Sequence, residues 1–407
     1  MTESRAAHPR VTTRITGVTG LRGLALLGVV LAHTWVNWTP RTVPAPVLQV
    51  MAGGLVLFFA LSGLVITLPF LRAAAGETPP VDLRRYAARR LARIYPAYVV
   101  VFLLSDAAAA VYLGNAVTTG VPGTATGAGR MTDPGDLAAN LLLVHSLFPA
   151  TLQTGINPSW SLTAELCFYL VVPLVSALVL QRMARQAERV LRRAAFLGAA
   201  LLLLGWVTRL VAEHWWRASG LPSVVAEFGP HGVAVLSRSA AGVADNFGAG
   251  VLVAVLVVAL EQGRFRSFSR ASVLAGCGAM LVASAVLTHL VTGPHPWFVG
   301  SAMALAAAAL LVLVAEPAAR RRSSRIAALC DNRVCFHLGV VSYGAYLWHY
   351  PVILTLARID SHVRLLGGDD ATTAVVAPLL VLGGSVLLAT LTWHAVEKPA
   401  LAWAARQ

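Results

Sequence analysis

The stretch GLRGLALLGVVLAHTWVNW, residues 20–38, is apolar at nearly every position except Arg22 and His33. The two residues are eleven positions apart. That is close to three turns of an α-helix, so both side chains lie on one stripe, about 16 Å apart along the axis. A charged group near the centre of a bilayer costs roughly 2.5–3.5 kcal/mol. We therefore expect these two polar residues to be used inside the protein.

The composition of the whole chain is that of a membrane protein. Of its 407 residues, 57% are hydrophobic and only 12% are charged, whereas an average soluble domain is about 25% charged. Apolar runs of about 20 residues fit the 30 Å hydrocarbon core of a bilayer. The sequence predicts an all-α polytopic membrane protein with about ten spans, near 17–37, 51–71, 94–114, 159–180, 194–213, 240–260, 272–292, 297–316, 337–357 and 373–396.

The net charge of +14 comes almost entirely from arginines between the apolar runs. Basic residues that flank spans mark cytoplasmic loops, here near 72–93, 181–193, 261–271 and 317–336. This pattern predicts a membrane domain over 17–399, with a segment 1–16 and a tail 400–407 that are both cytoplasmic. It explains the charge without a nucleic-acid partner and leaves the lipid bilayer as the expected surroundings. We find no cleavage site after the first apolar run and expect no removable signal peptide.

Several shorter features complete the topology. Residues 137–150 are apolar but too few to span, so we expect a re-entrant or interfacial piece. The segments 115–136 and 214–239 are predicted as outer loops. The four cysteines lack the spacing of a zinc site, so we expect free cysteines and no metal. Asp245 and Arg209 are further polar residues in or near spans, to which the sequence assigns no role.

Glu165 is the first candidate partner for His33. It lies about one turn into a span that is predicted to begin at the outer face, at a depth similar to that of His33. A carboxylate in a bilayer needs a partner, and a carboxylate beside an imidazole orients it for general-base catalysis. The alternatives for Glu165 are a structural hydrogen bond to Trp160, Ser161 or another helix, and a role at the start of its own helix, where acidic residues are favoured. For His33 the alternative is a packing or hydrogen-bonding role.

The inner run RRYAARRLARIYP, residues 84–96, places Arg90 and Arg93 on one helical face. Arginine forks suit phosphates, so this cluster is a candidate site for an anionic cofactor that enters from the cytoplasm. The alternative is simple anchoring of the span at the inner surface.

A second histidine, His349, lies at mid-span in VVSYGAYLWHYPV, residues 340–352. The aromatic residues around it, which include Tyr346, are compatible with a substrate gate and equally with helix packing at Pro351. We assign His349, Tyr346, Trp160 and Ser161 as candidate substrate-binding residues.

Six motifs, taken together and in order, resemble the acyltransferase 3 family of integral membrane O-acyltransferases. The family's Arg-x10-His first helix resembles residues 20–33, and its second-helix signature resembles FFALSGLVIT. The other four are RRLARIYPAY, SWSLTAELCFYLVVPLV, SYGAYLWHYPV and the terminal VEKP. Each motif is weak alone, but six in order along a ten-span chain are specific.

The resemblance implies an enzyme that moves an acyl group, usually from cytoplasmic acyl-CoA, to a hydroxyl of a sugar or another acceptor. The essential histidine of the family falls on His33, its first-helix arginine on Arg22, and its paired arginines on Arg90 and Arg93. The first glutamate of its EE pair falls on Glu165, while the second is replaced by Leu166. Some members carry an additional extracytoplasmic domain, and this chain resembles the form without it.

These observations predict a mechanism. Arg22, Arg90 and Arg93 would hold the acyl-CoA phosphates, and His33, oriented by Glu165, would take the proton of the acceptor hydroxyl. A relay through a covalent acyl-enzyme is the alternative mechanism.

The rival function is transport of a glycan or small molecule. A scaffold without catalysis would leave His33 and Glu165 unexplained. The abundance of Arg, Ala, Gly and Val favours a high-GC bacterium, hence its plasma membrane and a cell-envelope glycan or glycosylated metabolite as acceptor.

Overall fold

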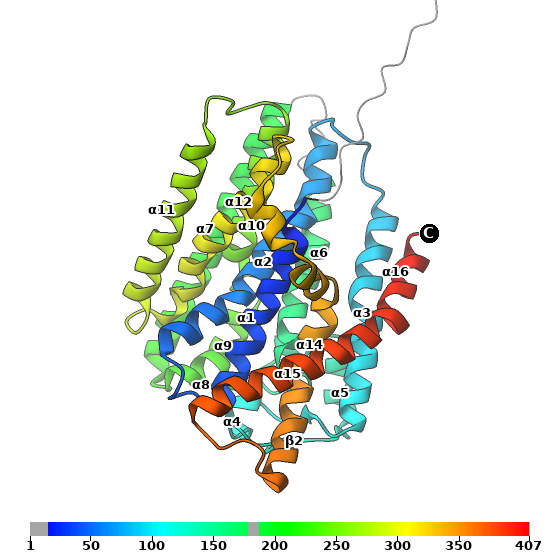
Figure 1. Cartoon of the computed structure of the whole chain (residues 1–407), viewed down its shortest axis with the longest axis vertical. Helices are drawn as coiled ribbons and strands as arrows, with labels where there is room; N and C mark the ends of the chain where they lie inside the picture. Colours follow the sequence, from blue (N-terminus) through cyan, green and yellow to red (C-terminus); the bar gives the residue numbers. More distant parts are fainter. Residues whose placement is uncertain (1–14, 178–186, 407) are drawn as a thin grey trace, which may run out of the picture.

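The computed structural model describes residues 15–177 and 187–406, and most of this part of the chain is helical. Figure 1 shows most of the long helices running along the length of the molecule, with α15 crossing them obliquely. The long helices are α1 (Val18–Trp38), α2 (Ala45–Ala74), α3 (Leu83–Ala107), α6 (Trp160–Val175), α7 (Ala187–Ser219), α10 (Ala244–Glu261), α11 (Arg270–Val291), α12 (Val299–Ala319), α14 (Arg333–Val363) and α15 (Ala371–Thr392).

These helices confirm the predicted all-α polytopic membrane fold. Eight of the described helices are long and apolar enough to cross a bilayer. The other two long helices, α3 and α14, begin with charged turns and coincide with the predicted spans 94–114 and 337–357. The span predicted to reach residue 114 is wrong at its end, because Ala109 adopts a left-handed conformation (φ +53°) just after α3 ends.

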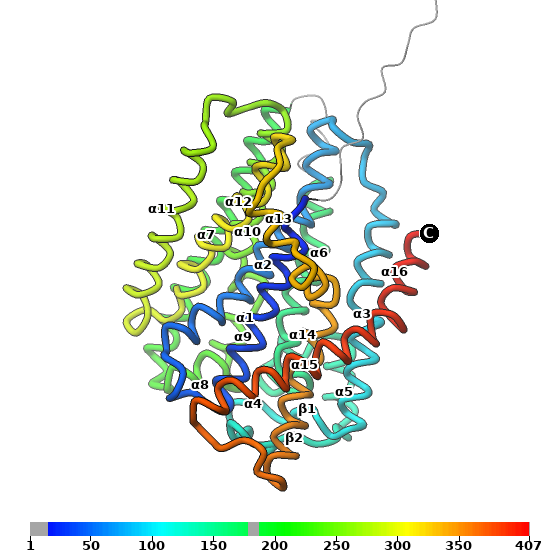
Figure 2. Tube along the Cα trace, viewed as in Figure 1, coloured from blue at the N-terminus to red at the C-terminus, as the bar shows by residue number. Residues whose placement is uncertain are grey.

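Short elements connect the long helices. The tube in Figure 2 follows these connections through β1 and β2 below α14. The two strands pair antiparallel, with Val111 opposite Gly129. The short elements are β1 (Val111–Tyr112), α4 (Ala116–Thr119), β2 (Ala128–Gly129), α5 (Pro134–Leu141), η1 (His145–Leu147), η2 (Asn157–Ser159), α8 (Ser223–Phe228), α9 (Gly232–Arg238), η5 (Pro296–Phe298), α13 (Arg325–Cys330), η6 (Trp393–Glu397, a π turn) and α16 (Lys398–Ala404).

Of two predicted connections between spans, residues 137–150 agree with the structure and residues 214–239 do not. Residues 137–150 form the end of α5 and the single turn η1, and eight residues of α5 rise only about 12 Å, too little for a span. The prediction of a non-spanning piece is therefore confirmed. The segment 214–239 is not a plain loop: α7 continues to Ser219, and α8 and α9 follow, while Gly220 (φ +66°) and Pro222 separate α7 from α8.

The connections predicted to be cytoplasmic gather at one end of the bundle. Arg72 at the end of α2 donates to the Glu261 carboxylate at the end of α10. Arg320, after α12, donates to the carbonyl of Phe265 in the connection between α10 and α11. Figure 1 shows this end at the top, and β2, α4 and α8 at the opposite end. Part of the predicted loop 181–193 and most of the segment 1–16 lie outside the described residues.

Side-chain caps fix where α3 and α14 begin. The Asp82 carboxylate accepts hydrogen bonds from the backbone N–H groups of Arg84 and Arg85, at 3.0 and 3.1 Å. The Asn332 side chain caps α14 in the same way. Caps of this kind satisfy the free N–H groups of the first helical turn. They fix the register in which α3 presents its arginines and α14 its aromatic residues.

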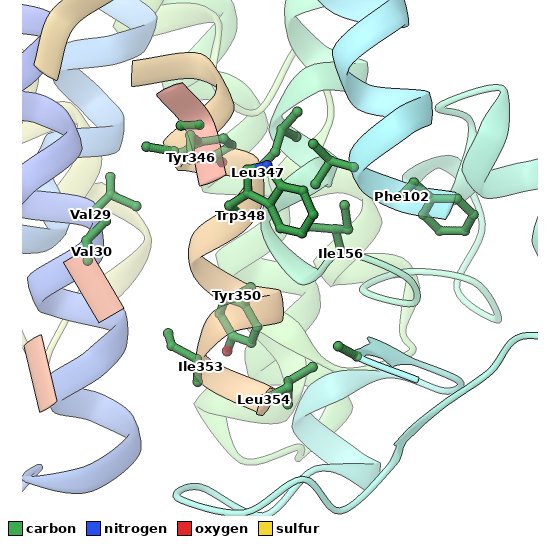
Figure 3. Packing of buried hydrophobic residues seen from close by; sticks show 14 of the residues in the cluster. Val29, Val30, Phe102, Ile156, Tyr346, Leu347, Trp348, Tyr350, Ile353 and Leu354 are labelled. Atoms are coloured by element: carbon green, nitrogen blue, oxygen red, sulfur yellow. The ribbon is translucent and has the colours of Figure 1, made fainter. Parts of the chain in front are cut away.

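The largest hydrophobic cluster surrounds α14, whose residues from Val341 to Ala357 are almost all buried. Figure 3 shows Tyr346, Trp348 and Tyr350 of this helix packed among residues of α1, α3 and the connection before η2. Because α14 is covered on nearly every side, its polar groups face other helices rather than lipid.

Helices α2 and α10 pack backbone against backbone. A Cβ atom added at Gly250 would lie 1.9 Å from the carbonyl oxygen of Ala60, and one at Gly63 would lie 2.3 Å from the carbonyl oxygen of Phe247. Small residues permit this close approach in membrane bundles. The crossing therefore requires glycine on both helices.

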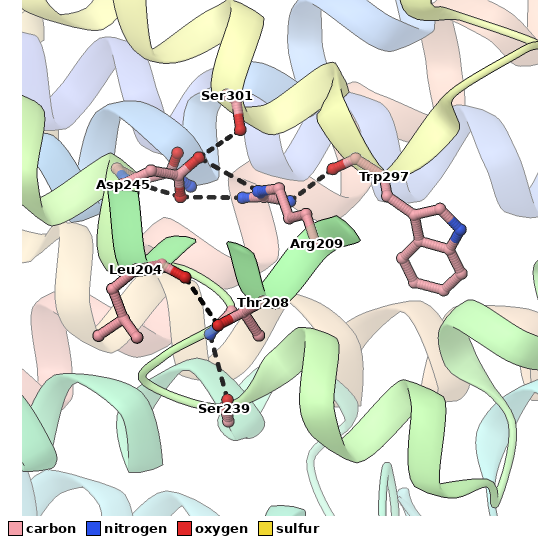
Figure 4. A network of polar contacts seen from close by, with 9 residues as sticks. Leu204, Thr208, Arg209, Ser239, Asp245, Trp297 and Ser301 are labelled. Carbon is pink, nitrogen blue, oxygen red and sulfur yellow. Dashed lines mark hydrogen bonds and ion pairs between the residues drawn. The ribbon is translucent and has the colours of Figure 1, made fainter. Parts of the chain in front are cut away.

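A buried polar network joins α7, α10 and α12, as Figure 4 shows. The Arg209 guanidinium donates to both carboxylate oxygens of Asp245, at 3.1 Å each, and to the carbonyl of Trp297 at 2.7 Å. Ser301 also donates to Asp245. The two polar residues left without a role by the sequence are thus each other's partners, as buried charges require.

The last helices return to α3. After α15, the π turn Trp393–Glu397 leads into α16, and Arg85 of α3 donates to the carbonyl of Ala405 at 2.9 Å. The predicted tail 400–407 begins inside α16, which contacts α3.

Candidate active site

A narrow cavity opens between α1, α2, α3, α6 and α14. Its volume is about 80 Å³, below the roughly 300–1,000 Å³ of common ligand pockets. A cavity of this volume holds only a small part of a larger ligand. Its walls include Arg22, Ser62, Arg90, Arg93, Glu165 and Tyr346.

The three predicted cofactor-binding arginines share this cavity. Arg22 comes from the first turns of α1, and Arg90 and Arg93 come from one face of α3. Aromatic rings support both α3 arginines: the Arg90 guanidinium lies 5.1 Å from the ring centre of Tyr169, and that of Arg93 lies 5.7 Å from Tyr343. Cation–π contacts hold a guanidinium in place without using its hydrogen-bond donors. The cavity thus gathers three guanidinium groups beside the Glu165 carboxylate.

Glu165 lies in the same cavity but does not contact His33, so the predicted pair is wrong. Its Oε1 atom accepts hydrogen bonds from the Ser62 hydroxyl at 2.9 Å and the Tyr169 hydroxyl at 2.8 Å. Similar depth in the membrane suggested the pair, but depth does not fix the direction in which a helix presents a side chain. The structure places Glu165 with the arginines instead.

His33 is paired with His349. The Nδ1 atom of His33 lies 3.0 Å from Nε2 of His349, and the two rings stack with their centres 5.1 Å apart. The edge of Tyr350 closes the group, with its ring centre 5.3 Å from that of His33. His349 is fully buried and His33 is partly exposed. His349 is therefore the hydrogen-bond partner of the predicted base His33. The sequence had suggested instead that His349 contacts the substrate.

Tyr346 lies between the cavity and the histidine pair. Its hydroxyl is 2.7 Å from that of Ser161 and donates to the carbonyl of Pro158 at 2.8 Å. Its backbone carbonyl lies 2.6 Å from Nδ1 of His349. Tyr346 and Ser161 line the cavity, while His349 follows Tyr346 by one helical turn. The histidine pair thus lies about 5 Å beyond the cavity wall along α14.

Trp160, like His349, is a predicted substrate-binding residue that does not line the cavity. Its ring lies 6.2 Å from that of Phe59 and 5.0 Å from the Arg238 guanidinium. These contacts pack α6 against α2 and α9.

Glu397 is a site residue that sequence reasoning missed. Its carboxylate, fully buried in the π turn, lies 3.2 Å from the Arg93 guanidinium. Trp393, from the same turn, stacks on Arg93 at 5.8 Å. The sequence signal was available in the VEKP motif, but sequence spacing gives no indication that the end of the chain returns to α3.

Comparison with known proteins identifies the family of the chain. A sequence model of the family described as "Acyltransferase domain" matches residues 15–394. The chain is 28% identical to Acyltransferase MdmB of Streptomyces mycarofaciens, over 97% of this chain and 93% of that protein.

It is 25% identical to the Putative peptidoglycan O-acetyltransferase YrhL of Bacillus subtilis (strain 168), over 95% of this chain and 54% of that protein. The chain thus spans about half the length of YrhL. No solved structure shows a significant match. With a family match over nearly its whole length and a fold of membrane-spanning helices, the chain belongs to the acyltransferase 3 family of multi-pass membrane acyltransferases.

Proposed function

We propose that the protein transfers an acyl group from acyl-CoA to a hydroxyl of a sugar, in a cell-envelope glycan or a glycosylated metabolite, at the plasma membrane of a bacterium. The observation that carries the proposal is the succession, along α14, of an arginine-lined cavity, Tyr346 and a histidine pair. The printed name of YrhL, a putative peptidoglycan O-acetyltransferase, supports a carbohydrate acceptor. The family assignment favours this function over the transport alternative.

The donor is proposed to approach from the arginine end of the cavity, on the cytoplasmic side. Acyl-CoA carries several phosphate charges, and Arg22, Arg90 and Arg93 offer guanidinium groups that match them. Its pantetheine arm is thin and linear, which agrees with the narrow cavity. The thioester would then pass Tyr346 to reach His33, and rotation of this side chain would open the path.

His33 is proposed as the general base. Its imidazole takes the proton of the acceptor hydroxyl while that oxygen attacks the thioester carbonyl. The new C–O bond forms, the C–S bond breaks, and the CoA thiolate recovers the proton from His33. Glu165 acts on the donor side in this proposal: its charge balances that of Arg22 within the cavity.

The test is label transfer in membranes. Membranes from a bacterial host that produces the full chain are incubated with acetyl-CoA labelled in the acetyl group, and ester-linked label is measured in the carbohydrate and glycolipid fractions. Wild type is expected to give alkali-labile label that His33→Ala lacks. His289→Ala, an exposed change on α11, is the control. Equal labelling by His33→Ala and wild type would remove the proposed base; absence of labelling in every fraction would oppose the proposed donor.

A further inference from the structure

The two hydrogen bonds of His349 determine where the protons of the histidine pair lie. Nδ1 of His349 is 2.6 Å from the carbonyl oxygen of Tyr346, one turn earlier on α14. Nε2 of the same ring is 3.0 Å from Nδ1 of His33. His349 is fully buried, so water does not compete for these atoms.

A neutral imidazole has one N–H donor and one acceptor nitrogen. A carbonyl oxygen only accepts, so Nδ1 of His349 must carry its proton. Nε2 of His349 is then an acceptor, and the hydrogen bond requires the proton to be on Nδ1 of His33. The chain of bonds leaves Nε2 of His33 without a proton.

We propose that His349 is a positioning residue that holds His33 in the Nδ1–H form and so leaves its Nε2 lone pair free to take the acceptor's proton. The inference rests on the proposed function of His33 as the base. In serine hydrolases an aspartate selects the tautomer of the catalytic histidine in the same way. Here a neutral imidazole, itself fixed by a backbone carbonyl, takes that place.

The arrangement also serves the step that follows. When Nε2 of His33 takes the proton, the ring becomes an imidazolium, and its Nδ1–H still donates to Nε2 of His349. A hydrogen bond from a charged donor is stronger than a neutral one. The pair therefore stabilises the charge that develops during acyl transfer, without a permanent carboxylate beside His33.

Two substitutions separate positioning from packing. His349→Gln places an amide near the position of Nε2 and keeps an acceptor for His33, while His349→Phe fills the volume and removes the acceptor. Both full-length variants are compared in nanodiscs with His289→Phe, the same change at an exposed position on α11. Gel filtration and thermal unfolding check that each variant is folded.

The first measurement is the tautomer itself. Protein labelled with ¹⁵N-histidine is studied by NMR, and the His33 signals are identified by their loss in His33→Ala. Wild type and His349→Gln are expected to show a protonated Nδ1 and an unprotonated Nε2 on His33, whereas His349→Phe is expected to show the reverse. A protonated Nε2 in wild type would overturn the proposal.

The second measurement is the kinetics of acetyl transfer from acetyl-CoA. His349→Phe is expected to lower kcat about a hundredfold and to leave KM for acetyl-CoA within twofold, while His349→Gln recovers at least a tenth of wild-type kcat. Wild-type kcat in His349→Phe would overturn the proposal. Failure of the proposed function and failure of this inference give different results. Full activity in His33→Ala would refute His33 as the general base, whereas the NMR measurement would still report which nitrogen of His33 carries the proton.

Discussion

The Arg93 guanidinium lies 3.2 Å from the buried carboxylate of Glu397, and this ion pair ties a wall of the cavity to the last turn of the membrane domain. The two residues come from α3 and from the π turn after α15, more than 300 positions apart in the sequence. Breaking a buried pair by removing one charge leaves the other uncompensated, at a cost of about 3–5 kcal/mol.

Glu397→Gln is therefore expected to lower the midpoint of thermal unfolding in detergent. The proposed donor supplies phosphates that would pair with the released guanidinium. Acetyl-CoA is expected to raise the midpoint more in Glu397→Gln than in wild type. Glu188→Gln, at an exposed position of α7, is the matched control. Equal stabilisation of wild type and Glu397→Gln by acetyl-CoA would contradict a contact between Arg93 and the phosphates of the donor.

Glu165→Gln tests the revised role of this carboxylate. Because Glu165 contacts Ser62 and Tyr169 rather than His33, kcat is expected to stay within about tenfold of wild type, while His33→Ala lowers it at least a hundredfold. Loss of a negative charge from the arginine-lined cavity is expected to lower KM for acetyl-CoA. Steady-state kinetics with both variants makes the comparison. A kcat for Glu165→Gln as low as that of His33→Ala would contradict this revised role and would indicate that Glu165 takes part in the chemical step.

Gly250→Ala tests the crossing of α2 and α10. The added methyl group would lie 1.9 Å from the Ala60 carbonyl oxygen, so the helices must separate, at a cost of roughly 1–3 kcal/mol or more. We expect a lower midpoint of thermal unfolding. Gly276→Ala in α11 meets no atom within 4 Å and is expected to keep or raise the midpoint. Similar midpoints for the two variants would contradict the close packing.

Glu77, in the connection after α2, predicts a pH dependence of stability. Burial raises its pKa to about 7, and the nearby Glu261 carboxylate contributes. The folded state then holds a proton that the unfolded chain releases near pH 4.5. Stability from this group is complete below pH 4.5 and is lost as the pH rises through 7.

Glu77→Gln is expected to remove that dependence and to raise the midpoint of thermal unfolding at pH 8 relative to wild type. The measurement is thermal unfolding in detergent at pH 5.5 and pH 8. Asp82→Asn, at the exposed cap of α3, changes a carboxylate nearby and serves as control. An unchanged difference between the two pH values in Glu77→Gln would rule out this group as the source.

The sequence could predict relationships within one helix but not rotations between helices. Arg22 and His33 share a stripe of α1 because eleven residues make three turns, and Arg90 and Arg93 share a face of α3 for the same reason. Apolar runs and basic clusters likewise predicted where the long helices lie, with errors only at their ends.

The partner of His33 depended on the packing of α1 against α14. A Cβ atom at Gly339 would lie 1.9 Å from the Thr19 carbonyl oxygen, and one at Gly23 would lie 2.3 Å from that of Cys335. These close approaches fix the rotation of the two helices and bring His349 beside His33. The periodicity of a single helix does not encode how α1 and α14 are rotated against each other. The prediction of Glu165 as the partner of His33 therefore rests only on their similar depth in the membrane.

The Arg209–Asp245 pair has a consequence for how the protein enters the membrane. Arg209 is synthesised 36 residues ahead of Asp245. An arginine at the centre of an inserting helix costs about 2.5–3.5 kcal/mol, and Arg209, nearer one end of the span 194–213, costs less; each leucine, isoleucine, phenylalanine or valine returns roughly 0.3–0.6 kcal/mol. The apolar residues of α7, whose mean hydropathy reaches 1.9, must outweigh that charge during biogenesis. Arg209 is neutralised only when α10 arrives beside α7.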